Sequence, residues 1–264
     1  MVSIFVAMRI PLDYFVWRQR AKKDYKFLDS SISQLINDFW RRPVPENIEK
    51  KISEARNDLF SLKNIFPKGI DLGAGPKKKS RRSLASIVQQ SSISSLHSQV
   101  IFNTIQYLKP SKILELGTGL GISTLYMALA NPEARIITIE GNKDLAEQAK
   151  IIFNKIQLQN IQVEIGSFEE NLPDAIYDLG GVELAFIDGD HTFQGLIKNT
   201  ETITSLSKPP FVLIFDDIRW SNQMLNAWRL IQENPYLRLN IDLYSMGVSF
   251  CINYPQKENV WVRI

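Results

Sequence analysis

Five short apolar runs alternate with longer segments of helical periodicity, and this alternation limits the chain to one class of fold. The runs occupy residues 112–116, 135–139, 161–165, 183–187 and 211–215. Each has the length of a typical strand, and its nearly continuous apolar character is typical of parallel strands that helices cover on both faces. We therefore predict a doubly wound, mostly parallel α/β sheet.

Two further strands are expected toward the C-terminal end of the sequence. Residues 237–254 contain two apolar stretches joined near Ser245, Met246 and Gly247, close enough together to pair as an antiparallel hairpin. Together with the five runs they give a predicted sheet of seven strands.

The N-terminal part of the sequence has a different character. Residues 30–40 and 47–66 show helical spacing, and the first 75 residues contain no convincing buried strand. A glycine- and lysine-rich connector follows at residues 69–82. We therefore predict a helical appendage at residues 1–75 and a main domain at residues 76–264.

The composition excludes several classes of function. The 31 Lys and Arg residues nearly balance the 28 Asp and Glu residues, so the net charge of +3 is too small to direct the whole molecule to nucleic acid or anionic lipid. One cysteine, Cys251, and two histidines can form neither an internal disulfide nor a Cys/His zinc site. The apolar run at residues 2–8 is short and has no basic residues before it, so we expect neither a signal peptide nor a membrane span there. We expect the protein to be cytoplasmic.

Polar residues follow nearly every predicted strand, where parallel sheets bind their ligands. In strand order they are Gly117 to Gly121, then Glu140, then Gly166 to Phe168, then Asp188 to His191, then Asp216 and Asp217. Because the carboxyl ends of parallel strands lie at one edge, we expect these residues to form a single site.

The glycine-rich segment after the first strand does not fit the dinucleotide fingerprint. Counted from Gly117, that fingerprint requires glycine at position 122, where the chain has Ile122. The pattern present is Glu115-x-Gly117-x-Gly119-x-Gly121, with Glu140 at the end of the next strand. A carboxylate there suits the two ribose hydroxyls of a nucleoside, and the helix N-terminus after the turn suits an anionic group. A tight connection without a ligand is the structural alternative.

With these motifs, segment 99–220 resembles the class I S-adenosylmethionine-dependent methyltransferases. More narrowly, it is similar to the metal-dependent O-methyltransferases of small molecules, the group that includes the catechol and caffeoyl-coenzyme A enzymes and sugar-modifying relatives. The resemblance implies a Rossmann-like fold, S-adenosylmethionine as cofactor, and a hydroxyl group of a small molecule as methyl acceptor. The cofactor-binding residues that it implies are Glu115, Gly117, Thr118, Gly119, Gly121, Ser123, Glu140, Gly141, Ser167, Phe168, Asp188 and His191.

The resemblance also implies a divalent cation, Mg²⁺, Ca²⁺ or Mn²⁺, held by Asp188, Asp216 and Asp217. The cation would bind the acceptor hydroxyl and favour its deprotonation, which makes Asp188 a catalytic residue. His191 stands where catechol-type members carry lysine and some sugar-modifying relatives carry histidine, and it is the implied proton acceptor. Asp217 departs from the asparagine that is usual in the catechol-type members.

Other interpretations remain open at this point. The acidic residues could be helix caps or solvated loop charges, and His191 a hydrogen-bonded loop residue. Trp220 and Trp228 are expected to be packing residues, although Trp220 could flank the site. An RNA-modifying methyltransferase could use the basic run Lys77 to Arg82 to contact nucleic acid, and a non-catalytic S-adenosylmethionine-binding protein is a third function. The helical appendage would cap the site, select the acceptor, or form a homodimer contact.

Overall fold

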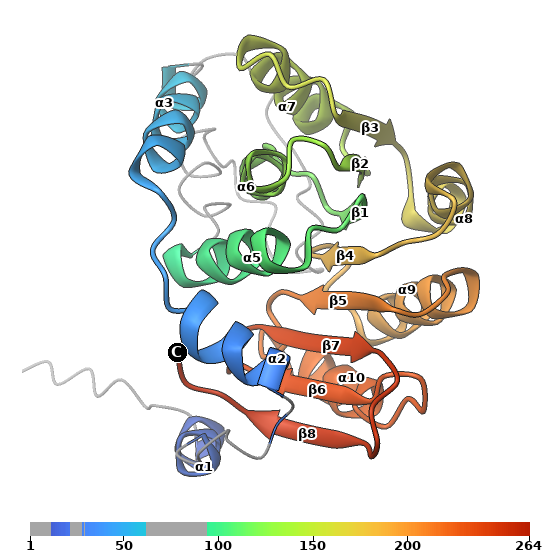
Figure 1. Cartoon of the computed structure of the whole chain (residues 1–264). Coiled ribbons are helices and arrows are strands. Elements are labelled where there is room, and N and C mark those ends of the chain that lie inside the picture. Colours follow the sequence, from blue (N-terminus) through green and yellow to red (C-terminus); the bar gives the residue numbers. More distant parts are fainter. Residues whose placement is uncertain (1–11, 22–27, 29, 62–93) are drawn as a thin grey trace, which may run out of the picture.

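The computed structural model describes residues 12–21, 28, 30–61 and 94–264, and its centre is a sheet of eight strands (Figure 1). The strands are β1 (Lys112–Leu116), β2 (Arg135–Glu140), β3 (Ile161–Ile165), β4 (Leu184–Ile187), β5 (Phe211–Phe215), β6 (Leu239–Asp242), β7 (Gly247–Cys251) and β8 (Glu258–Trp261). Their order across the sheet is β3-β2-β1-β4-β5-β7-β6-β8. All five apolar runs form strands, as predicted.

The direction of the strands also agrees with the prediction, with one addition. Strands β1 to β5 pair in parallel, and β7 pairs antiparallel with both β5 and β6, which forms the expected C-terminal hairpin. The eighth strand was not predicted. It pairs in parallel with β6, with Leu239 opposite Glu258, and extends the sheet at that edge.

Helices cover both faces of the sheet (Figure 1), which is why central strands such as β4 and β5 consist of apolar residues only. One face carries α5 (Ser95–Leu108), α6 (Ile122–Ala130) and α7 (Lys143–Lys155), and the other carries α8 (Phe168–Leu179), α9 (Phe193–Leu206) and α10 (Asn222–Ile231). Strand β5 shows the resulting alternation. Val212 and Ile214 belong to the core on the α5 side, and Phe211, Leu213 and Phe215 to the core on the α10 side.

The N-terminal residues that the structure describes form helices, as expected. They are α1 (Leu12–Arg20), α2 (Ser30–Gln34), the π-helix η1 (Leu35–Phe39) and α3 (Glu46–Ser61). Leu35, Ile36 and Trp40 are fully buried and belong to the same core as α5 and α6. The indole Nε1 of Trp40 donates to Oγ1 of Thr104 on α5 at 2.8 Å. The appendage therefore packs into the core of the main domain, while the predicted boundary at residue 75 lies outside the described residues.

Candidate functional site

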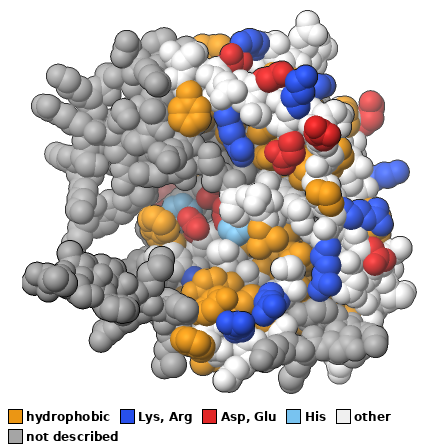
Figure 2. Space-filling model, turned by 90° about the vertical axis from the view of Figure 1, so that its left-hand side faces the viewer, with side chains coloured by type: hydrophobic (Ala, Val, Ile, Leu, Met, Phe, Trp, Pro, Cys, Tyr) orange, Lys and Arg blue, Asp and Glu red, His pale blue; other side chains and the backbone are white. Residues whose placement is uncertain are grey.

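The predicted site residues lie on loops at one edge of the sheet. The loops after β2, β1, β4 and β5 follow one another in space, because these four strands are neighbours in that order. Figure 2 shows histidine and acidic side chains gathered on one face of the molecule. Within the described residues, no helix has the length and apolar composition needed to cross a bilayer.

The glycine turn after β1 is shaped by close contact with the β4 loop. Gly117 has a φ of +100°, and a Cβ at this position would lie 2.4 Å from the carbonyl oxygen of Asp188. At Gly119, a Cβ would meet no described atom within 4 Å. Gly121 then forms the N-cap of α6, whose first turn starts at Ile122. The turn therefore presents an open surface at Gly119 beside the positive end of a helix dipole.

Glu140 points toward this turn. Its Oε2 accepts a hydrogen bond from the backbone N–H of Gly119 at 2.7 Å, and its Oε1 accepts one from Asn142 N–H at 2.8 Å. Burial raises the pKa of Glu140, against the lowering effect of these backbone donors. Each carboxylate oxygen has a second lone pair, so the carboxylate could also accept ribose hydroxyls.

Glu115 supports the glycine turn from inside the core. It is fully buried, and its carboxylate accepts hydrogen bonds from the hydroxyls of Ser123 at 2.5 Å, Thr124 at 2.5 Å and Thr138 at 2.6 Å. Burial raises its pKa to about 7, although these three hydroxyls act in the opposite direction. Thr118 joins the network through its hydroxyl, 2.6 Å from that of Thr138. In this structure the Ser123 hydroxyl is thus bonded to Glu115.

Ser167 and Phe168, two of the cofactor-binding residues that the resemblance implies, lie after strand β3. Ser167 is the N-cap of α8, and its side chain accepts from Glu170 N–H. Phe168 lies beside the β4 loop, because a Cβ at Gly189 would be 2.5 Å from its ring atom Cζ. Gly141 borders the loop after β3, with its Cβ position 3.8 Å from the carbonyl oxygen of Gly166.

Asp188, His191 and Asp217 form a cluster next to the glycine turn, because the backbone of Asp188 lies against Gly117. One ligand atom from each lies within 4.8 Å of the others, and His191 Nε2 is 3.9 Å from Asp188 Oδ1. Burial raises the pKa of Asp188 well above its ordinary value, and the charges of Asp216 and Asp217 raise it further. The pKa of Asp217 is raised by burial and by Asp216. Such mutual repulsion favours binding of a cation.

The donor set fits a divalent cation. Two carboxylates and one imidazole in reach of a common point are ligands that Mn²⁺ accepts, and the carboxylates alone suit Mg²⁺. Asp217, which belongs to the cluster, has a φ of +53°, an uncommon conformation for a residue with a side chain. Its neighbour Asp216 is not a member of this cluster.

Asp216, the third predicted metal ligand, has other partners in this structure. Its Oδ1 accepts from Nδ1 of His97 at 2.8 Å and from Asp217 N–H at 2.9 Å. The other ring nitrogen of His97, Nε2, lies 2.7 Å from Oγ of Ser245. Burial alone would lower the pKa of His97, but the hydrogen bond and charge of Asp216 and the charge of Asp217 raise it.

His97 is not among the predicted site residues, and its spacing along the chain does not point to the site. It lies on α5, far from the other site residues along the chain. The two tryptophans also differ from each other. Trp228 is fully buried, as expected for packing, whereas Trp220 is 62% exposed, with its ring centroid 6.1 Å from that of His191. Trp220 therefore flanks the cluster.

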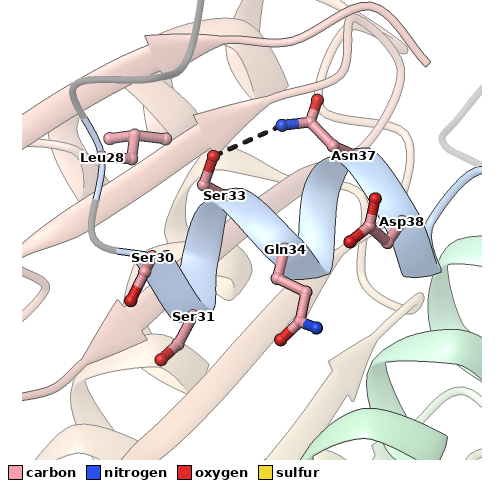
Figure 3. Close-up of a pocket in the computed structure, with 7 residues that line it drawn as sticks. All are labelled: Leu28, Ser30, Ser31, Ser33, Gln34, Asn37 and Asp38. Carbon is pink, nitrogen blue, oxygen red and sulfur yellow. Dashed lines mark hydrogen bonds between the residues drawn. The ribbon is translucent and has the colours of Figure 1, made fainter.

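The basic run Lys77 to Arg82, which the RNA-modifying alternative would use to contact nucleic acid, lies outside the described residues. A cavity of about 650 Å³ lies along α2 and η1, where Asn37 Nδ2 donates to Ser33 Oγ (Figure 3). Its lining residues are Leu28, Ser30, Ser31, Ser33, Gln34, Asn37 and Asp38, none of which is a predicted site residue.

Comparisons with known proteins converge on one class of domain. Residues 114–218 match a family described as methyltransferase domain. Over 94 residues, the chain is 34% identical to the catechol O-methyltransferase of Sus scrofa, and the match covers 34% of this chain and 50% of that protein. The chain thus spans about half the length of the curated relatives that it matches.

Solved structures share the fold at low sequence identity. An SAH-bound methyltransferase from Podospora anserina superimposes with a TM-score of 0.59 and 16% identity, over 81% of this chain and 90% of that one. An O-methyltransferase from Bacillus cereus in complex with SAH gives 0.53 and 19%, over 76% and 100%. The sheet, its C-terminal hairpin and the flanking helices therefore form a Rossmann-like methyltransferase fold.

Proposed function

With a methyltransferase domain at residues 114–218 as the premise, we propose that the protein is an S-adenosylmethionine-dependent O-methyltransferase that acts on a hydroxyl group of a small molecule. One observation carries the proposal. The glycine turn and Glu140 meet the Asp188, His191 and Asp217 cluster at the close contact between Gly117 and Asp188. A nucleoside on one side and an acceptor on the other would therefore be neighbours.

The cofactor side is formed by the glycine turn. S-adenosylmethionine, when bound, supplies a methyl group on a positively charged sulfur. Glu140 would accept the ribose hydroxyls, and the N-terminus of α6 after Gly121 would face the carboxylate end. Glu115 holds the turn in place through Ser123 and Thr124, which lie in the first turn of α6.

The acceptor side is formed by the acidic cluster. A divalent cation, when bound, would hold the acceptor hydroxyl and lower its pKa. Asp188 and Asp217 would be its carboxylate ligands, with Asp216 as the third ligand that the resemblance implies. His191 is the proposed acceptor of the hydroxyl proton, and Trp220 would form a wall of the acceptor site.

The proposal also assigns roles to the N-terminal helices and a location to the protein. The described N-terminal helices would cap the site or select the acceptor, and a homodimer contact through them stays a prediction. Cys251, the single cysteine of the chain, is buried, and a cytoplasmic location is part of the proposal.

Calorimetry tests the cofactor. We expect S-adenosylhomocysteine to bind the full chain and NAD not to bind, because the fingerprint for a dinucleotide is broken at Ile122. If neither S-adenosylhomocysteine nor NAD binds, the cofactor assignment is contradicted. NAD binding alone would contradict it as well.

Transfer of a labelled methyl group tests the acceptor class. We expect label to appear in a small-molecule extract, and to decrease when a chelator removes divalent cations. Label found only in total RNA would replace the proposal with RNA modification. Activity that a chelator leaves unchanged would reject the role of the cation and leave the cofactor assignment standing.

A further inference from the structure

His97 connects three elements around one of the acidic residues. It lies near the start of α5, Asp216 follows β5, and Ser245 lies in the turn between β6 and β7. The same turn is tied to the β5 loop by the backbone, because Ile218 N–H donates to the carbonyl oxygen of Ser245 at 3.1 Å. The imidazole therefore fills the space between a loop of the site and a fixed turn.

The hydrogen bonds define what the ring does to Asp216. An ionised carboxylate only accepts hydrogen bonds, so His97 Nδ1 carries the proton of the 2.8 Å contact to Oδ1. Ser245 holds the opposite ring nitrogen at 2.7 Å, which fixes the plane of the ring. The same Oδ1 accepts from Asp217 N–H at 2.9 Å, so two donors from different directions fix the carboxylate of Asp216.

We propose that His97, itself fixed by Ser245, is a positioning residue that acts through Asp216: it holds the carboxylate that accepts from Asp217 N–H, and so keeps Asp217 in place beside Asp188 and His191 for the cation. Both side chains of the pair are about nine-tenths buried, with 9% exposure for His97 and 10% for Asp216. In metal sites, such outer partners fix the orientation of the ligands and their loss weakens metal affinity. The inference rests on the cation site of the proposed function.

Three variants of the full chain separate positioning from simple packing. His97→Phe keeps a ring and removes both hydrogen bonds. His97→Asn keeps an amide N–H donor on the atom bonded to Cγ, as in Nδ1, and so can still donate to Asp216. Ser245→Ala removes only the outer partner. Thr104→Val is the matched control, because it removes the acceptor of the buried hydrogen bond that Trp40 Nε1 donates to the same helix.

The measurement is a titration with Mn²⁺ followed by electron paramagnetic resonance, with a urea unfolding curve for each variant. We expect His97→Phe to weaken Mn²⁺ affinity by about 10- to 100-fold. We expect His97→Asn to recover most of that affinity and Ser245→Ala to give a smaller loss. Thr104→Val should lower the urea midpoint and leave Mn²⁺ affinity unchanged.

Each contrary outcome has a definite meaning. Wild-type affinity in His97→Phe, or no recovery in His97→Asn, would overturn the positioning role while the cation site stands. If the wild-type chain does not bind Mn²⁺, both the positioning role and the cation site are overturned, and binding of S-adenosylhomocysteine then tests the remaining proposal separately.

Discussion

Gly119 and Glu140 are joined by a hydrogen bond from the backbone N–H of Gly119 to Oε2 of Glu140, 2.7 Å long. The bond forms because β1 and β2 are parallel neighbours, with Leu116 opposite Ile139, so that the two strand ends reach the same edge. It keeps the glycine turn and the carboxylate in one fixed arrangement. A nucleoside bound at the turn would therefore meet Glu140 directly.

Glu140→Gln should weaken binding of S-adenosylhomocysteine. A glutamine amide offers one acceptor oxygen in place of two, and its NH₂ group would face the N–H donors of Gly119 or Asn142. Hydrogen bonds to a charged group contribute about 1.5–3 kcal/mol, so we expect affinity to fall by about tenfold to a hundredfold in calorimetry. The control is Glu147→Gln on the exposed side of α7, which should bind as the wild type does. Equal affinity in both variants would contradict the role of Glu140.

Glu115 should make the free energy of unfolding decrease as the pH rises from about 4.5 to about 7. Its pKa is about 7 in the folded chain, against an ordinary value of 4.5, so the folded state binds more protons between these two values. The stability that the protonated carboxyl contributes is complete below about pH 4.5 and is lost as the pH rises through about 7. Its size is about 3 kcal/mol, from the free energy of a pKa shift of this extent.

The variant Glu115→Gln isolates this contribution, because its amide is uncharged at every pH. We expect the free energy of unfolding of the wild type, minus that of the variant, to decrease by about 3 kcal/mol between pH 4.5 and 7. Above this window the difference should be constant. Urea unfolding at a series of pH values measures it, and a difference that does not change with pH would contradict the raised pKa.

The sequence predicted most of the fold because the strands are buried on both faces. A short, continuous apolar run such as residues 211–215 is typical of a strand that helices cover on both faces of a parallel sheet. Strand β8 escaped prediction because its four residues include Glu258 and Asn259, and only Val260 is buried. Its pairing depends on the free edge of β6, which is a tertiary feature that local sequence does not contain.

The candidate site could be predicted only as far as spacing along the chain determines it. Asp188 and His191 are three residues apart in the sequence, and in the structure Asp188 Oδ1 and His191 Nε2 lie 3.9 Å from each other. The pairing of His97 with Asp216 depends on how α5 packs against the sheet, so no local pattern indicates it. Likewise, the spacing along the chain does not indicate which of the two adjacent aspartates, Asp216 or Asp217, joins the cluster, and in the structure it is Asp217.

Gly117→Ala should be far more destabilising than Gly119→Ala. Both residues have positive φ values, +100° and +54°, so each substitution costs about 1–2 kcal/mol in backbone conformation. At Gly117 the new Cβ would also lie 2.4 Å from the backbone oxygen of Asp188, which no side-chain rotation can relieve. At Gly119 it would meet no described atom within 4 Å. Urea unfolding compares the two, and equal midpoints would mean that the turn and the β4 loop are not in contact.

Trp40→Ala tests whether the N-terminal helices belong to the core of the main domain. The indole is fully buried and donates to Thr104, so we expect truncation to cost about 3–5 kcal/mol. Trp220→Ala is the control, because that side chain is 62% exposed and surface substitutions cost about 0.5 kcal/mol or less. With a shared core, Trp40→Ala should shift one cooperative unfolding transition of the whole chain. An appendage that folds independently would instead unfold in a separate, earlier transition and leave the main one unchanged, because the sheet would lose none of its own contacts.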